Sequence, residues 1–155
     1  MNFVSASQNI LFAAFGAAVL GVSAPGFALA SGCGFLPVTF VECPSTLKPS
    51  QTAFCGVWGE QKWNDVLPHC LVVEEVAPDG SGKIVYGWGT APQWNIHDPG
   101  YRRHDARIEG NSLKASFSRF GGWVNLEYRL DGDALHGTYS YRGRNVHITL
   151  RRFGE

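Results

Sequence analysis

The stretch that decides the fold is WVNLEYRLDGDALHGTYSYRGRNVHITLRRF, residues 123–153. Apolar and polar side chains alternate along three segments of it, and a period of two is typical of a half-buried β-strand. Two short turns, DGD at 131–133 and GRN at 143–145, separate these segments, and both have the composition of tight hairpin turns. The stretch therefore predicts three consecutive antiparallel strands, each with one apolar face.

The same pattern extends back to residue 55, with Gly, Asn and Asp clusters every eight to twelve residues. The predicted strands lie near residues 56–63, 69–76, 83–89, 103–109, 112–118, 123–130, 134–142 and 145–153. We predict an all-β fold, an antiparallel up-and-down barrel of about eight strands, because closure removes the exposed edges of an open sheet. A β-sandwich is the alternative.

The first forty residues have a different character, since the first charged residue is Glu42. An apolar run at residues 10–22 is followed by the small-x-small sequence ALA at 28–30, which a signal peptidase accepts. The run is shorter than the roughly 20 apolar residues of a membrane span, so no transmembrane segment is expected. We predict a signal peptide at residues 1–30, a Pro-rich disulfide-bearing arm at 31–54 and a β-barrel domain at 55–155, in a periplasmic or secreted protein.

The four cysteines fit this compartment. An even number in an exported chain predicts two disulfides, and Cys33, Cys43, Cys55 and Cys70 allow three pairings. A second interpretation starts from the sequence ASGC, residues 30–33, which resembles the lipobox of bacterial lipoproteins. In that case Cys33 carries a lipid anchor.

Two further motifs resemble known families. The sequence GVW at 56–58, together with Arg152 on the apolar face of the last predicted strand, resembles the calycin signature of lipocalins and avidins. The resemblance implies that Trp58 and Arg152 stack and close one end of a lipocalin/avidin-like barrel. The sequence YGWG at 86–89, followed by WN at 94–95, resembles small domains of exported bacterial hydrolases, which implies an accessory role.

The longest connection of the predicted barrel, Thr90–Arg102, is the first candidate for a binding site, because long loops often carry function. Aromatic side chains on this loop could stack on a planar ligand or a sugar ring, and polar ones could form hydrogen bonds. Polar residues on the inner strand faces predict a cavity, although a self-satisfied core is the alternative. The predicted ligand-binding residues are Trp88, Trp94, Tyr101, His97, Glu60, Tyr128 and Tyr139.

Composition and motifs restrict the classes of function. Thirteen basic and thirteen acidic residues cancel, which argues against nucleic-acid binding. The sequence contains no Gly-x-Ser-x-Gly nucleophile elbow and no cysteine spacing typical of zinc, so we assign no catalytic residue, cofactor or metal.

Three functions follow from this. The first is an exported module that binds a small molecule at the barrel mouth. The second is an accessory or inhibitor domain that binds an exported hydrolase. The third is a small hydrolase or isomerase that uses His97 or His104 with Glu60.

Overall fold

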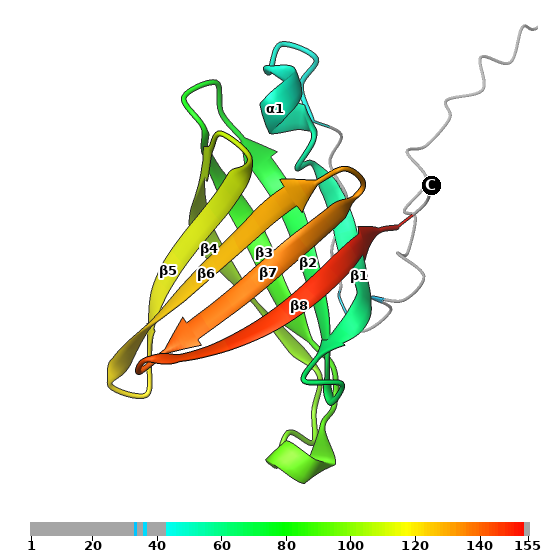
Figure 1. Ribbon diagram of the computed structural model, residues 1–155, viewed down its shortest axis with the longest axis vertical. Helices are drawn as coiled ribbons and strands as arrows, with labels where there is room; N and C mark the ends of the chain where they lie inside the picture. The colour runs from blue at the N-terminus through cyan, green and yellow to red at the C-terminus, as the bar shows by residue number, and fades with distance from the viewer. Residues whose placement is uncertain (1–32, 34–35, 37–42, 154–155) are drawn as a thin grey trace, which may run out of the picture.

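The computed structural model describes Cys33, Leu36 and residues 43–153, apart from the side chain of Glu60. Eight antiparallel strands form a closed barrel in which each strand pairs with its neighbours in sequence and β8 returns to β1 (Figure 1). The strands are β1 (Gly56–Trp63), β2 (Leu67–Val76), β3 (Ser81–Trp88), β4 (Gly100–Glu109), β5 (Ser112–Arg119), β6 (Gly122–Asp131), β7 (Ala134–Tyr141) and β8 (Arg144–Arg152). One helical turn, α1 (Pro49–Thr52), precedes the barrel, and a 3-10 turn, η1 (Pro92–Trp94), lies in the longest loop. The all-β, up-and-down barrel prediction is confirmed.

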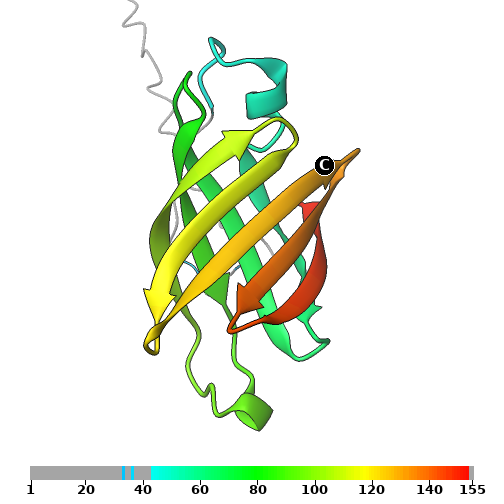
Figure 2. The same cartoon turned by 60° about the vertical axis from the view of Figure 1, so that its left-hand side comes forward.

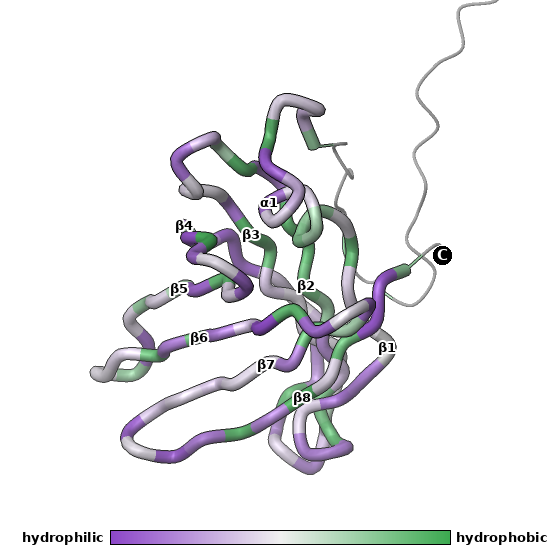
Figure 3. Tube along the Cα trace, turned by 45° about the horizontal axis from the view of Figure 1, so that its top comes forward, coloured by the Kyte–Doolittle hydropathy of each residue, from purple (hydrophilic) through white to green (hydrophobic). Residues whose placement is uncertain are grey.

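The inner faces are those that the period of two predicts. Leu126 on β6 pairs with Tyr139 on β7, which pairs in turn with Val146 on β8, and all three point inward. Figure 3 shows the alternation as changes between hydrophilic and hydrophobic colours along the strands. The boundary that differs most from the prediction is the start of β4, which lies at Gly100, so Tyr101 belongs to a strand and not to the loop.

One end of the barrel is closed by a buried indole and a guanidinium. The guanidinium carbon of Arg152 lies 4.5 Å from the centroid of the Trp58 ring, as the calycin resemblance implies. Arg152 donates hydrogen bonds of 2.7 and 2.6 Å to the carbonyls of Cys55 and Ala53, and the Trp58 indole donates to Phe54 O at 2.8 Å. Because Phe54 is fully buried beside α1, this end of the barrel is plugged (Figure 1).

The arm is tied to the barrel by two disulfides, Cys33–Cys70 and Cys43–Cys55. Of the three pairings that the sequence allows, this is the one that forms. Leu36 packs against the outer face of β2 and β3, where Val85 is fully buried. A polar outer face on β3, which simple alternation predicts, is therefore wrong at Val85, because the arm covers it. The predicted signal peptide lies outside the described residues, which include no helix with the length and hydrophobicity of a membrane span.

At the other end of the barrel, two pairs of neighbouring strands diverge, and we call each gap a seam. β4 pairs with β5 only through Arg107–Glu109, and β1 pairs with β8 only at two positions, Trp58 and Gly59. The ladders β3–β4, β5–β6 and β7–β8 run the full length of their strands. The barrel thus consists of two four-stranded halves that diverge away from α1 (Figure 2). We call the splayed end the mouth.

Candidate ligand site at the barrel mouth

The mouth contains a cavity of about 320 Å³. Its walls come from both halves of the barrel and from the loop around η1, which projects beyond this end (Figure 1). Most of the lining side chains are rings or branched aliphatics: Trp63, Leu67, Tyr86, Trp94, Ile96, Phe120, Tyr139, Tyr141 and Val146, with Arg119 as the charged member. The cavity lies at the lower end of the ~300–1,000 Å³ range of small-molecule sites.

Stacked rings support the cavity from below. His69 lies under Trp63 and Tyr86, with ring centroids 5.2 and 4.4 Å away, and it stacks nearly parallel to Tyr128 at 6.0 Å. Trp63 also meets Tyr139 edge to face at 6.1 Å. Because these rings contact one another from five strands, they fix the shape of the mouth before any ligand arrives.

His69 is held in one tautomer. Its Nδ1 lies 2.8 Å from Gly87 O, which can only accept, so Nδ1 carries the proton. Its Nε2 then accepts a 2.8 Å hydrogen bond from the Tyr128 hydroxyl. Burial lowers the pKa of His69 to about 4, against the smaller opposing effect of the Gly87 hydrogen bond. Both ring nitrogens form hydrogen bonds within the protein, and the imidazole is neutral at pH 7. His69 therefore holds the rings of the mouth in place and has no free nitrogen to act as a general base for a ligand.

The Trp63 indole N–H offers the mouth a free donor. Trp63 Nε1 is buried and has no hydrogen-bond partner of good geometry among the described residues. It lies close enough to the Tyr86 hydroxyl to lower the pKa of that group, although burial dominates and raises the pKa of Tyr86 well above its usual value. A buried donor without a partner carries an energetic cost that a bound acceptor would remove.

A second cavity, of about 260 Å³, opens where β4 and β5 diverge. It is lined by Tyr86, Trp88, Arg102, His104, Phe117, Ser118, Arg119 and Phe120. The His104 ring stacks on Phe117 with a centroid distance of 3.9 Å and an interplanar angle of 9°. We call this space the seam cavity. It shares Tyr86, Arg119 and Phe120 with the mouth cavity, so the two adjoin.

The sequence-predicted residues fall into three groups. Trp94 and Tyr139 line the mouth cavity, and Trp88 lines the seam cavity beside it. Tyr128 is fully buried beneath the mouth, where its hydroxyl is engaged by His69, whose buried position we did not predict.

The remaining predicted residues lie elsewhere. Tyr101 faces outward on β4 and is 38% exposed, with the Arg103 guanidinium 5.5 Å from its ring centroid. His97 is exposed and hydrogen bonds to the Asn95 side chain at 3.0 Å. Glu60 belongs to β1, and its side chain lies outside the described part of the structure.

Sequence reasoning missed Trp63, His69, Phe117 and Arg119. For His69 the signal was present, since it alternates with Leu71 and Val73 on the inner face of β2. Arg119 shares the inner face of β5 with Phe117, but its place beside Tyr86 depends on the divergence of β4, which no local pattern shows.

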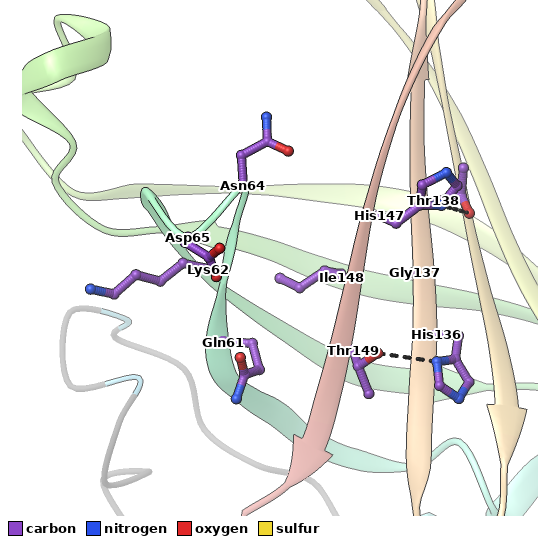
Figure 4. A pocket seen from close by; sticks show the side chains of 10 residues that line it. All are labelled: Gln61, Lys62, Asn64, Asp65, His136, Gly137, Thr138, His147, Ile148 and Thr149. Carbon is purple, nitrogen blue, oxygen red and sulfur yellow. Dashed lines mark hydrogen bonds between the residues drawn. The ribbon is translucent and has the colours of Figure 1, made fainter.

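A polar groove of about 550 Å³ runs along the other seam, between β1 and β8 (Figure 4). Its β7 and β8 wall carries two cross-strand hydrogen bonds, His136 Nδ1 to Thr149 at 3.1 Å and Thr138 to His147 Nδ1 at 3.2 Å. These histidines point outward while His69 points into the core, so the three do not converge. Within the described ranges, no group of three His, Cys, Asp or Glu side chains is placed to hold a metal ion.

Comparison of the chain with protein-family models, with curated proteins and with solved structures finds no match.

Proposed function

We propose that this protein is an exported, calycin-like β-barrel module that binds a small ligand with planar or sugar-like faces at the barrel mouth. The observation that carries the proposal is the ring-lined cavity of about 320 Å³ at the splayed end of a barrel whose other end is plugged. A filled barrel used only as a scaffold would have no need of such a space, because interiors normally pack with few voids larger than a water molecule.

The chemistry of the walls supports a ligand with flat faces. Trp63, Tyr86 and Tyr139 present rings from three different strands, and flat rings are recognised by stacking or edge contacts with such side chains. The unpartnered Trp63 N–H supplies one directional donor at the cavity wall. Trp94, which is 41% exposed on the loop around η1, adds a further ring to the lining of the cavity.

Export is supported by the two disulfides, since such bonds persist mainly in oxidising compartments. The candidate cleavage sequence at residues 28–30 supports it independently. Because Cys33 is paired with Cys70, its thiol is not free for the lipid that the alternative interpretation requires.

Native mass spectrometry of the protein purified gently from its own periplasm or medium tests the proposal. We expect a stoichiometric small-molecule adduct that denaturation releases. Val146→Trp should abolish the adduct, because Val146 lines the cavity and the larger ring fills it. His147→Trp is the matched control, since the next residue on β8 faces outward and its substitution should leave the adduct intact. A bare mass, or an adduct that survives Val146→Trp, would overturn binding at the mouth.

A second candidate function, an accessory or inhibitor domain for an exported hydrolase, is favoured by one observation. Phe120 and Trp123 on the β5–β6 hairpin are 76% and 67% exposed. Phe120 has a φ of 48°, a left-handed conformation that is rare for a bulky residue, and Tyr141 and Arg142 both hydrogen bond to its carbonyl. Exposed aromatic residues in a fixed conformation are typical of protein interfaces. A protein partner in the same mass spectrum, lost from a Phe120→Ser and Trp123→Ser double variant, would favour this function.

A further inference from the structure

We propose that the seam cavity between β4 and β5 is an anion subsite, and that the ligand is an organic anion whose aromatic body lies in the mouth cavity and whose acidic group lies in the seam. The inference rests on the proposed function, because it assigns one part of the ligand to each of two adjoining cavities. The acidic group is a planar or tetrahedral oxyanion such as a carboxylate or a sulfonate.

Two guanidinium groups line the seam cavity from its opposite walls. Arg102 pairs with Tyr86 across β3 and β4, so its side chain lies on the inner face of the barrel. Arg119 lies on the inner face of β5, as Phe117 does. Its positive charge lowers the pKa of Tyr86, although burial has the larger effect and raises that pKa. Guanidinium groups suit oxyanions, because their N–H groups match the spacing of two oxygens.

Among the described residues, neither guanidinium forms an ion pair with a carboxylate. None of the residues that line the seam cavity or the mouth cavity is acidic. The ion pairs among the described residues involve neither Arg102 nor Arg119, whereas the neighbouring Arg103 is paired with Glu74 at 2.8 Å on the outer face. Arginines on the outer faces thus pair with carboxylates, whereas Arg102 forms no ion pair and the Arg119 guanidinium lies over the Phe120 ring, 4.7 Å from its centroid.

His104 adds a polar atom without a hydrogen-bond partner, Nε2, to the cavity that Arg102 and Arg119 line. Its Nε2 is buried and has no hydrogen-bond partner among the described residues, while its ring is fixed against Phe117. Burial, followed by the positive charge of Arg102, lowers its pKa. A bound oxyanion would give this nitrogen a partner and would offset the charge of Arg102.

The diverging strands leave room for the group. From Gly100 to Ala106, β4 has no ladder partner on the β5 side, and β5 has none on the β4 side from Ala115 to Arg119. Where two strands diverge, their facing backbone N–H and C=O groups lack ladder partners and are open to a bound group. The seam cavity also adjoins the mouth cavity at Tyr86 and Phe120, so one small molecule can occupy both.

Two fluorescent dyes with the same aromatic frame separate the subsite from the mouth. 1-Anilinonaphthalene-8-sulfonate carries a sulfonate, and N-phenyl-1-naphthylamine lacks it. Titration of the full-length mature protein with each dye gives two dissociation constants. We expect the sulfonate dye to bind about tenfold more tightly, which is the scale of one charge-assisted hydrogen bond.

Variants at the seam cavity test whether its residues cause the difference between the dissociation constants of the two dyes. Arg102→Gln should remove most of the preference for the sulfonate dye and change binding of the neutral dye less than about twofold, because Arg102 lines only the seam cavity. Arg119 lines both cavities, so Arg119→Gln should weaken the sulfonate dye more than the neutral dye. His104→Phe keeps the ring against Phe117 and removes the nitrogen, so it should weaken only the sulfonate dye. Arg129→Gln is the control, because Arg129 faces outward on β6 beside Glu127. Thermal unfolding of each variant confirms that the barrel is intact.

The outcomes distinguish the two proposals. Equal affinity for both dyes, or a preference that Arg129→Gln reduces as much as the seam variants do, overturns the anion subsite while leaving ligand binding at the mouth in place. Binding of the sulfonate dye that Val146→Trp does not weaken places the dye outside the mouth and also overturns the subsite. A third outcome is that neither dye binds, although the native protein carries an adduct that Val146→Trp abolishes. The mouth then binds a ligand of another class, so the anion subsite is overturned and the proposed function is kept.

Discussion

Acidification should weaken the barrel through His69, the histidine buried beneath the mouth. Its pKa falls to about 4 in the folded protein because burial disfavours the charged imidazole, and its value in the unfolded chain is 6.5. Between these values the unfolded chain binds a proton that the folded protein does not. The folded state is therefore destabilised as the pH falls through 6.5, and the loss is complete below pH 4.

The size of this effect follows from the difference in pKa. One pKa unit corresponds to about 1.4 kcal/mol, so His69 lowers the free energy of unfolding by about 2 kcal/mol between pH 7 and pH 5 and by about 3 kcal/mol at pH 4. Total stabilities of single domains are ~5–15 kcal/mol, so the change is easily measured.

Urea denaturation at a series of pH values, with intact disulfides, measures the effect. The comparison is a double variant, His69→Leu with Tyr128→Phe, which replaces the hydrogen-bonded pair by two apolar side chains and leaves no buried hydroxyl without a partner. The loss of the His69 hydrogen bond to Gly87 O shifts the variant by a constant amount that does not depend on pH. His104, whose pKa is also lowered, titrates in both proteins and cancels in the difference.

We expect the wild-type stability to fall faster than that of the double variant as the pH drops from 7 to 5. Parallel stability curves for the two proteins would refute the reasoning. So would an NMR titration in which the His69 ring protonates near pH 6.5, since burial would then not disfavour the charged imidazole.

Three further changes test other parts of the fold by urea denaturation. Arg152→Ala should destabilise the protein by about 3 kcal/mol, because it removes a stacked cation and two hydrogen bonds, whereas Arg151→Ala on the outer face should cost less than ~1 kcal/mol. A loss from Arg152→Ala no larger than the control would remove the role in barrel closure. Gly137→Ala should cost ~1–3 kcal/mol, because the new methyl carbon would lie 2.8 Å from the Tyr128 ring, and an unchanged midpoint would contradict that packing. Phe120→Asn should instead stabilise the hairpin by ~1 kcal/mol, since Asn tolerates the positive φ better, and a lower midpoint would argue against the left-handed conformation.

Much of the fold was predictable because its signal is local. The alternation at 123–153 predicted the inner faces of β6 to β8, and the barrel that these strands complete is the one observed. The closure by Trp58 and Arg152 was predictable as a pair, although only the fold places the carbonyls of Ala53 and Cys55 within reach of the guanidinium.

The candidate site was predictable only in part. Trp88, Trp94 and Tyr139 line the two cavities, but Tyr101 faces outward because β4 begins earlier than predicted. Tyr128 lies on the inner face, as alternation predicts, yet its partner His69 comes from a strand 59 residues earlier in the sequence.

The sequence by itself determined which residues form strands and which side chains face inward, because both depend on a period of two between neighbours along the chain. Only the tertiary structure decided which cysteines pair, that Arg102 and Arg119 line one cavity, and which strands diverge. Those outcomes depend on the stagger and twist with which eight strands close, and hence on distances between residues far apart in the chain.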